Sequence, residues 1–357
     1  MGVEFYPLVT HVRPETDQAV VLTFSVPDDL RAVFRHTPGQ HVVLRAVIDG
    51  HDVRRSYSIC SSPADDRFAV AIKRIPGGIF STWATTELAD GDVLEVMPPI
   101  GEFTHEVQPQ RAGRYVAVAA GSGITPLLSI VTTVLEDEPD SSCTLVYGNR
   151  TTASVMFLEE IEALKNHYTD RLSVVHTLSR EPHEVPLFEG RIDAAKMRLL
   201  AGSLIEPSTV DGWYLCGPLE MVETVTSTLV DELGVNPSTV HQELFFDQRI
   251  DAAVAERHPA GSGVSLAITL GGRTSTVLAD PDGPSVLDYA RTVRSDVPFA
   301  CKGGMCATCK AQVTAGKVRM DKNYALTAGE IEAGYVLTCQ AHPLDGDVAV
   351  TFDTTSR

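Results

Sequence analysis

The sequence predicts a multidomain fold: an antiparallel β-barrel, then a doubly wound α/β domain with a parallel sheet, then a smaller α+β domain. The rhythm of apolar runs changes twice along the chain, and the charge is unevenly distributed. A chain of 357 residues exceeds what one hydrophobic core normally supports, so two or three domains are expected. Residues 264–357 carry a net charge of −1, so −17 of the total of −18 lies in the first 263 residues.

The first 105 residues contain short alternating runs separated by Pro and Gly. The runs span residues 19–26, 40–48, 68–73 and 93–96. Turn pairs fall beside them at Pro38-Gly39, Asp49-Gly50 and Asp90-Gly91. Evenly spaced short strands of this kind are typical of an antiparallel barrel or sandwich. We therefore assign residues 1–105 to a barrel domain.

The pattern changes in residues 106–247, where apolar strands alternate with amphipathic helical stretches. The expected strands span residues 115–120, 144–147, 172–178 and 212–216. Helical periodicity is clearest in residues 126–135 and 157–167. Alternation of strands and helices predicts a doubly wound sheet with parallel strands.

The end of the chain contains a linker and a third domain. Residues 248–263 are rich in Ala, Gly and charged residues without apolar periodicity, which predicts a linker. The domain at 264–357 opens with a hairpin around Gly271-Gly272 and continues with a helix that begins near Ser285. A cysteine-rich loop follows, and a strand at 348–352 ends the domain.

Composition excludes several classes of function. No run of about eighteen apolar residues is present, so no membrane partner is expected. The formal charge of −18 argues against a nucleic-acid partner, which would require a basic face. The first residues lack a basic stretch followed by an apolar run, so we expect no signal peptide and a reducing, cytoplasmic location.

The cysteines predict an iron–sulfur site. The spacing Cys-x4-Cys-x2-Cys followed by a distant cysteine is typical of plant-type [2Fe–2S] ligands, and two irons each need two protein sulfurs. A structural zinc site or two disulfides are the alternatives, although zinc commonly uses paired Cys-x2-Cys units and only one is present. The predicted ligands are Cys301, Cys306, Cys309 and Cys339. The remaining cysteines, predicted not to be ligands, are Cys60, Cys143 (expected in the core) and Cys216.

The end of the barrel segment contains a motif that suits a flavin. In Arg55-Ser56-Tyr57-Ser58, the arginine could bind a pyrophosphate, the aromatic ring could lie against an isoalloxazine, and a hydroxyl could approach its reactive nitrogen. The next apolar run ends at Lys73, and Gly78 and Ser81 lie at an expected helix start, where N–H groups bind phosphates. An ordinary strand with an exposed arginine is the alternative interpretation.

Two glycine turns in the α/β segment suit a nicotinamide dinucleotide. The segment Gly121-Ser-Gly123-Ile-Thr125 follows an apolar strand and opens a helix, although it lacks the third glycine of a Rossmann fingerprint. Cys216-Gly217-Pro218 ends another strand at the same edge of the sheet. Arg150 and Arg180 each end a strand, where they could pair with a 2′-phosphate or remain solvated loop charges.

In this order, the motifs resemble the ferredoxin–NADP reductase superfamily fused to a plant-type ferredoxin domain, over essentially the whole chain. More closely, the chain resembles the reductase subunits of multicomponent phenylacetyl-CoA epoxidases. Reductases of ketosteroid 9α-hydroxylases share the layout and a run very like residues 55–63, so this alternative stays open. The closer resemblance rests on Pro38-Gly-Gln-His41, Tyr147-Gly-Asn-Arg-Thr151, Gly190-Arg-Ile-Asp193, Cys301-Lys-Gly-Gly304, Asn323-Tyr-Ala-Leu326 and Gly334-Tyr-Val-Leu-Thr-Cys339-Gln.

The resemblance implies a ferredoxin-like β-grasp fold for the third domain, FAD as the flavin and NADPH as the donor. It also implies that electrons pass through the [2Fe–2S] cluster to the subunits of a di-iron oxygenase. A redox carrier or sensor without turnover is the alternative from another functional class. By position, the resemblance assigns the flavin to Arg55, Tyr57 and Ser58, its pyrophosphate to Gly78 and Ser81, the nicotinamide border to Thr125, Cys216 and Gly217, and the neighbours of the flavin ring to Glu243 and Phe245. The expected catalytic residues are Ser58, Thr125, Cys216 and Glu243.

Overall fold

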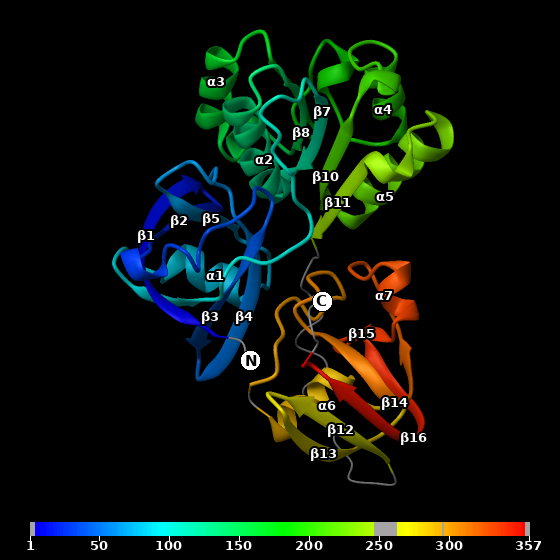
Figure 1. The fold of residues 1–357 in the computed structure, drawn as a ribbon. Coiled ribbons are helices and arrows are strands. Elements are labelled where there is room, and N and C mark those ends of the chain that lie inside the picture. The colour runs from blue at the N-terminus through cyan, green and yellow to red at the C-terminus, as the bar shows by residue number, and fades with distance from the viewer. Residues whose placement is uncertain (1–3, 246–262, 295, 354–357) are drawn as a thin grey trace. The chain divides into compact units, whose positions relative to one another are not determined.

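The computed structural model describes residues 4–245, 263–294 and 296–353, which form three sheets (Figure 1). Contacts divide the chain into two compact units, one of residues 7–42 and 57–247 and the other of residues 1–6, 43–56 and 248–357. The predicted multidomain fold class is confirmed, whereas the three domain boundaries stay predictions. The predicted linker, apart from Gly263, lies outside the described residues.

The first sheet is antiparallel and has the strand order β4-β3-β6-β1-β2-β5. Just beyond the end of β4, Ile59 pairs with Val70 of β5 in antiparallel fashion, so the two edges of the sheet meet as in the predicted barrel. One helix, α1 (Ile79–Thr86), follows β5. The strands are β1 (Tyr6–Thr16), β2 (Ala19–Ser25), β3 (His41–Ile48), β4 (His51–Ser58), β5 (Phe68–Lys73) and β6 (Val93–Val96).

The second sheet is parallel, with the strand order β11-β10-β7-β8-β9. The chain runs outward from β7 to β9 and then returns to the other side of β7, so the strand order reverses between β7 and β10. Ligands of open α/β sheets bind at the carboxyl ends of the strands at such a switch point. The strands are β7 (Arg114–Ala120), β8 (Ser142–Asn149), β9 (Leu172–Leu178), β10 (Gly212–Pro218) and β11 (Val240–Phe245).

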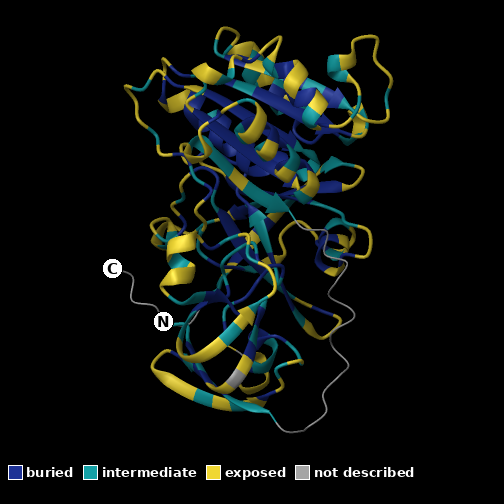
Figure 2. Cartoon of the chain, turned by 90° about the vertical axis from the view of Figure 1, so that its right-hand side faces the viewer, coloured by how far each residue is buried: buried dark blue, intermediate teal, exposed yellow. Residues whose placement is uncertain are grey.

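Helices connect the parallel strands, as the alternation of the sequence predicts. In Figure 2 the central strands of this sheet are largely buried, while the helices that cover it expose their outer faces. The helices are α2 (Ile124–Asp137), α3 (Leu158–His167), α4 (Ala194–Ala201) and α5 (Leu219–Ser227). Short 3₁₀ turns span Asp28–Leu30, Gly121–Gly123, Thr152–Ser154, Pro186–Phe188, Pro207–Thr209 and Pro237–Thr239, and a π-helix spans Thr228–Glu232.

The third sheet is mixed, with the strand order β13-β12-β16-β14-β15. The predicted hairpin at Gly271-Gly272 is present, and Ser285 caps the predicted helix by accepting a hydrogen bond from the Asp288 N–H. The predicted last strand begins earlier than expected, at Ala341. The elements are β12 (Val264–Leu270), β13 (Arg273–Ala279), α6 (Val286–Val293), β14 (Lys310–Met320), α7 (Ala328–Glu332), β15 (Tyr335–Leu337) and β16 (Ala341–Thr351). Among the described residues, no helix combines the length and the apolar character that crossing a membrane requires.

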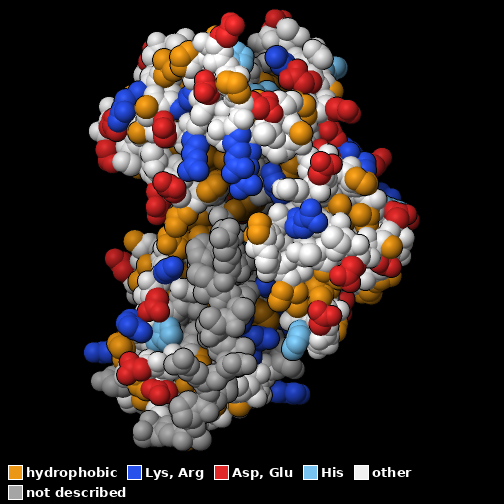
Figure 3. Space-filling view, turned by 180° about the vertical axis from the view of Figure 1, so that it is seen from behind, with side chains coloured by type: hydrophobic (Ala, Val, Ile, Leu, Met, Phe, Trp, Pro, Cys, Tyr) orange, Lys and Arg blue, Asp and Glu red, His pale blue; other side chains and the backbone are white. Residues whose placement is uncertain are grey.

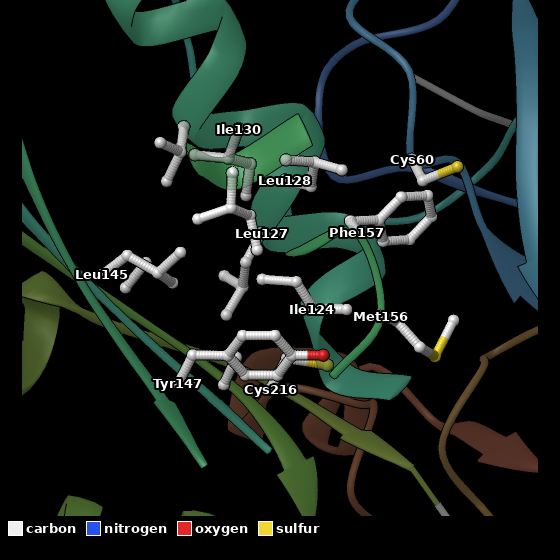
Figure 4. Packing of buried hydrophobic residues seen from close by; sticks show 14 of the residues in the cluster. Cys60, Ile124, Leu127, Leu128, Ile130, Leu145, Tyr147, Met156, Phe157 and Cys216 are labelled. Atoms are coloured by element: carbon white, nitrogen blue, oxygen red, sulfur yellow. The ribbon is translucent and has the colours of Figure 1, made fainter. Parts of the chain in front are cut away.

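One hydrophobic core joins the first sheet to the parallel sheet, and α2 runs through it (Figure 4). Ile124, Leu127 and Ile130 of this helix are at most 1% exposed. Residues of the barrel such as Cys60 and Ala69, and residues of β8, belong to the same cluster. Cys60, Cys143 and Cys216 all lie in this core, which confirms the prediction for Cys143.

A buried carboxylate at the end of α2 fixes the segment that leaves the barrel. Glu138 is fully buried and accepts hydrogen bonds from the Gln108 N–H (2.9 Å) and from Ser141 (2.7 Å), and it contacts His105 Nε2 at 2.9 Å. Burial alone would raise the pKa of Glu138, but these three contacts outweigh it and lower that pKa. The carboxylate therefore stays ionised and fully bonded.

We expect Leu127→Ala to lower the free energy of unfolding by about 2–5 kcal/mol, because Leu127 is completely buried in the shared core. Urea unfolding followed by tryptophan fluorescence measures this loss. Leu199→Ala removes the same atoms from a side chain that is 43% exposed and should change stability by no more than about 0.5 kcal/mol. Equal losses in the two variants would contradict the central role of this core.

Candidate functional site

The first predicted glycine turn lies directly against the second at the switch point of the parallel sheet. A Cβ on Gly123 would lie 2.1 Å from the Cys216 carbonyl oxygen and 2.8 Å from the Gly217 nitrogen, so only glycine fits there. Thr125 lies buried in the first turn of α2, and its hydroxyl donates to the Ser122 carbonyl (3.0 Å). The start of α2 is therefore held at the carboxyl end of β10.

A serine of the barrel meets a carboxylate of the parallel sheet. The Ser58 hydroxyl, at the end of β4, donates to Oε2 of Glu243 on β11 at 2.8 Å. Glu243 is also the register partner of Cys216 on β10. Burial, with a smaller contribution from the Glu243 carboxylate, raises the pKa of the Cys216 thiol, so this thiol stays neutral near pH 7. Three of the four expected catalytic residues thus converge from separate strands.

The other residues of the Arg-x-Tyr-Ser motif have buried polar atoms and an aromatic face. Arg55 is 7% exposed and donates to the Arg54 carbonyl at 2.8 Å. The Tyr57 ring lies 5.6 Å from the Phe80 ring of α1. The Ser56 hydroxyl is buried and has no hydrogen-bond partner among the described residues. Because buried polar atoms are nearly always satisfied, this orphaned hydroxyl fits a site that receives a polar ligand such as a flavin.

The turn before α1 presents backbone donors, and its serine is already engaged. Ser81 is 4% exposed, and its hydroxyl accepts a hydrogen bond from the Ile75 N–H (3.1 Å). Gly78 is the N-cap residue of α1. The first N–H groups of a helix lack partners within it, so the backbone of this turn, rather than the Ser81 side chain, supplies the donors suited to a phosphate.

Basic side chains lie near the first glycine turn. The Lys73 ammonium donates to the Ser154 carbonyl (3.4 Å), and burial together with the nearby Arg150 guanidinium lowers the pKa of Lys73. The Arg180 N–H donates to the Arg150 carbonyl (2.8 Å), so the two predicted arginines are neighbours at the carboxyl edge of β8 and β9, and both are exposed. In Figure 3, several Lys and Arg side chains lie close together on the surface of the parallel-sheet domain, which is in the upper part of the view.

Phe245, the last of the predicted flavin neighbours, is the final residue of β11. It is the register partner of Pro218, the residue after the second glycine turn. Its side chain is half-buried and packs against the shared core. The structure therefore brings Phe245 to the same end of the sheet as Glu243 and Gly217.

The four cysteines of the third domain lie close together in two pairs. Cys306 lies beside Cys301 and raises the pKa of its thiol, and Cys339 lies beside Cys309 and raises the pKa of its thiol. Among the described residues, no three His, Cys, Asp or Glu side chains are arranged around a single metal ion. Two pairs of thiols provide two protein sulfurs for each of two irons, which fits the predicted [2Fe–2S] ligand set.

The backbone of the cysteine loop is held in unusual conformations. Lys302 and Ala307 both have φ of +51°, which side chains other than glycine rarely adopt. The Gly303 N–H donates to the Cys301 sulfur at 3.3 Å. Such strain and such N–H···S contacts are expected where backbone wraps around a cluster.

Three family profiles match the chain in order. An oxidoreductase FAD-binding domain matches residues 9–105, an oxidoreductase NAD-binding domain residues 117–227, and a 2Fe-2S iron-sulfur cluster binding domain residues 268–344. One subunit of the 1,2-phenylacetyl-CoA epoxidase of Escherichia coli (strain K12) is 43% identical over 347 residues, which are 97% of this chain and 96% of that protein. The chain belongs to the ferredoxin–NADP reductase superfamily fused to a ferredoxin domain.

Other relatives agree with this assignment. The ferredoxin reductase component of the 3-ketosteroid-9-alpha-monooxygenase of Rhodococcus rhodochrous is 34% identical over 352 residues, covering 96% of this chain and 95% of that protein. The solved structure of phthalate dioxygenase reductase has the same fold, with a TM-score of 0.62 and 21% identity over 98% of both chains. The reductase is therefore an FAD- and iron–sulfur-dependent oxidoreductase.

Sequence reasoning missed two residues that contact predicted site residues. The Tyr147 hydroxyl donates to the Gly121 carbonyl at 3.0 Å and so supports the first glycine turn. His41 Nδ1 lies 3.8 Å from Oε1 of Glu243. Both residues occur in stretches that support the closer resemblance, but no spacing along the chain relates either one to its contact.

We expect Cys309→Ser to lose the iron and the visible absorbance of the cluster, because one iron would keep only one protein sulfur. Iron analysis and the absorption spectrum of the purified protein measure the loss, while the bound flavin should be retained. Cys60→Ala, which alters a buried thiol of the shared core, should retain about two irons per chain. Full iron content in Cys309→Ser would remove this residue from the ligand set.

Proposed function

We propose that this chain is an NADPH-dependent reductase that passes electrons through FAD and a [2Fe–2S] cluster to a di-iron oxygenase, the phenylacetyl-CoA ring 1,2-epoxidase. The contact between Ser58 and Glu243 at the switch point carries the proposal, because it joins the flavin motif of the barrel to the nicotinamide end of the parallel sheet. The likeness to the Escherichia coli epoxidase protein supports the choice of oxygenase. A cytoplasmic location, where thiols stay reduced, is part of the proposal.

The residues of the chain act by alignment. When bound, FAD would supply two-electron hydride chemistry and the cluster one-electron transfer. Hydride transfer requires close, fixed reactants and no general acid, so the task of the site is positioning. The hydrogen bond to Glu243 fixes the Ser58 hydroxyl, and the neutral, buried Cys216 thiol offers a dry surface at the nicotinamide border.

Each cofactor has a proposed set of residues on this chain. Arg55, Ser56, Tyr57, Ser58, Gly78, Ser81 and Phe245 would hold the flavin, with Ser81 acting through its turn. Lys73, Gly121, Gly123, Thr125, Cys216 and Gly217 would border the nicotinamide dinucleotide. Cys301, Cys306, Cys309 and Cys339 would hold the cluster.

A ketosteroid 9α-hydroxylase is the second candidate partner. The relative in Rhodococcus rhodochrous covers almost the whole chain at 34% identity, which favours the same reductase chemistry with a different oxygenase. The first candidate is preferred because identity to the epoxidase protein is 43% over a similar length.

We expect NADPH, added without oxygen, to bleach the absorbance of both the flavin and the cluster. Once O2 is admitted as the oxygen source, the reduced protein should support epoxidation of phenylacetyl-CoA by the purified oxygenase component of the epoxidase, measured as product formed per NADPH consumed. Absence of bleaching would contradict a reductase and favour a carrier or sensor. Bleaching with turnover only on a ketosteroid hydroxylase oxygenase would replace the proposed partner.

The choice of NADPH depends on the neighbouring Arg150 and Arg180, because guanidinium groups bind phosphates strongly and both lie exposed at the edge of β8 and β9. We expect Arg150→Ala to raise KM for NADPH about tenfold or more, with little change for NADH. Steady-state reduction of ferricyanide with each nucleotide measures the two values. Arg171→Ala, at the opposite end of β9, serves as the control. Equal effects of Arg150→Ala on both nucleotides would contradict a 2′-phosphate contact.

A further inference from the structure

A buried histidine of the barrel lies beside the carboxylate of the proposed site. His41 begins β3 and is 5% exposed, and its Nδ1 atom lies 3.8 Å from Oε1 of Glu243. The other oxygen of that carboxylate, Oε2, accepts the Ser58 hydrogen bond at 2.8 Å. The two oxygens of Glu243 therefore face two different residues of the barrel.

The backbone of His41 is fixed on both sides. Its N–H donates to the Ile100 carbonyl, and its carbonyl accepts from the Ile100 N–H, each at 2.9 Å. The preceding carbonyl, that of Gln40, accepts from the Ile59 N–H at 2.9 Å. Because Ile59 directly follows Ser58, the same network fixes the starting points of the His41 and Ser58 side chains.

The space for the imidazole depends on a glycine. Gly101 has φ of +123°, and a Cβ on it would lie 3.0 Å from His41 Nδ1 and 3.3 Å from His41 Cε1. A side chain at position 101 would therefore displace the edge of the ring that carries Nδ1, the atom nearest Glu243. The glycine at position 101 therefore leaves room for the observed orientation of the His41 ring, and none of the proposed cofactor contacts involves this ring.

We propose that His41 is a positioning residue that acts through Glu243. An imidazole at 3.8 Å is too far for a hydrogen bond, but with a proton on Nδ1 it would stabilise the negative charge of the carboxylate in this buried setting. The attraction of the imidazole for Oε1 orients the carboxylate so that Oε2 continues to accept the hydrogen bond from the Ser58 hydroxyl. With its proton donated to Glu243, the Ser58 oxygen would offer only its lone pairs to a bound flavin, as an acceptor. This inference rests on the proposed function of the site.

The proposed role of His41 concerns charge as well as rate. Without the imidazole, the carboxylate charge is less compensated, so electrons on a nearby flavin are less favoured. We expect His41→Ala to shift the flavin midpoint potential to a more negative value and to slow flavin reduction by NADPH about tenfold, with unchanged half-saturation. Spectroelectrochemical titration and stopped-flow absorbance of the holoprotein measure the two effects. His41→Gln, which keeps an N–H donor of similar size, should recover most of the rate.

The decisive comparison repeats His41→Ala in a Glu243→Gln background. If His41 acts through the carboxylate, both effects should vanish there. His176→Ala is the matched control. His176 lies on β9 at the far edge of the parallel sheet, and its Nε2 atom is also 3.8 Å from a glutamate oxygen, Oε1 of Glu162. This variant should leave the potential unchanged.

Two outcomes would count against the inference in different ways. Equal effects of His41→Ala in both backgrounds, or an unchanged potential and rate in a folded variant that NADPH reduces, would overturn the role of His41 alone. A wild-type protein that binds no flavin or is not reduced by NADPH would overturn the proposed function and this inference with it.

Discussion

The packing of α2 between two sheets is the constraint on which the proposed site depends. One side of the helix contacts the parallel sheet and the other contacts the barrel, within a single core. Polar contacts add to it: Ser129 donates to the Ser61 carbonyl and Ser62 to Glu136, each at 2.7 Å. Burial of this kind stabilises by roughly 25 cal/mol for each Å² removed from water, so the core resists any sliding of the barrel along the sheet. The end of β4 therefore meets the end of β11 at a fixed place.

Given this packing, each residue at the switch point of the parallel sheet has a distinct structural role. Gly123 lets α2 begin against the end of β10, and Tyr147 supports the same turn from β8. Glu243 connects the parallel sheet to Ser58 and lies close to His41, both of the barrel. None of these contacts is strong by itself, but together they fix the positions of a hydroxyl and a carboxylate, and fixed positions are what hydride transfer requires.

The domain that contains the four predicted cysteine ligands has a hydrophobic core of its own. Its four thiols come from one loop and one strand end, and its own small core of residues such as Leu266, Val286 and Val350 supports them. Its net charge of −1 contrasts with −17 for the remainder of the chain. Because the proposed flavin and cluster sites belong to one chain, transfer between them would not depend on protein concentration, so strong charge steering between the two would be unnecessary.

Local spacing and periodicity in the sequence were enough to predict the fold class, the two glycine turns and a set of four cysteine ligands. Alternation of strands and helices predicted the parallel sheet, and the Gly271-Gly272 hairpin formed as expected. The contact of Ser58 with Glu243, the position of His41 beside that carboxylate and the hydrogen bond of Ser81 within its own turn could be read only from the three-dimensional packing. Ser58, His41 and Glu243 lie on strands of different sheets or at different places in one sheet. Their meeting depends on strand order, register and the packing of α2, none of which leaves a periodic trace in the sequence.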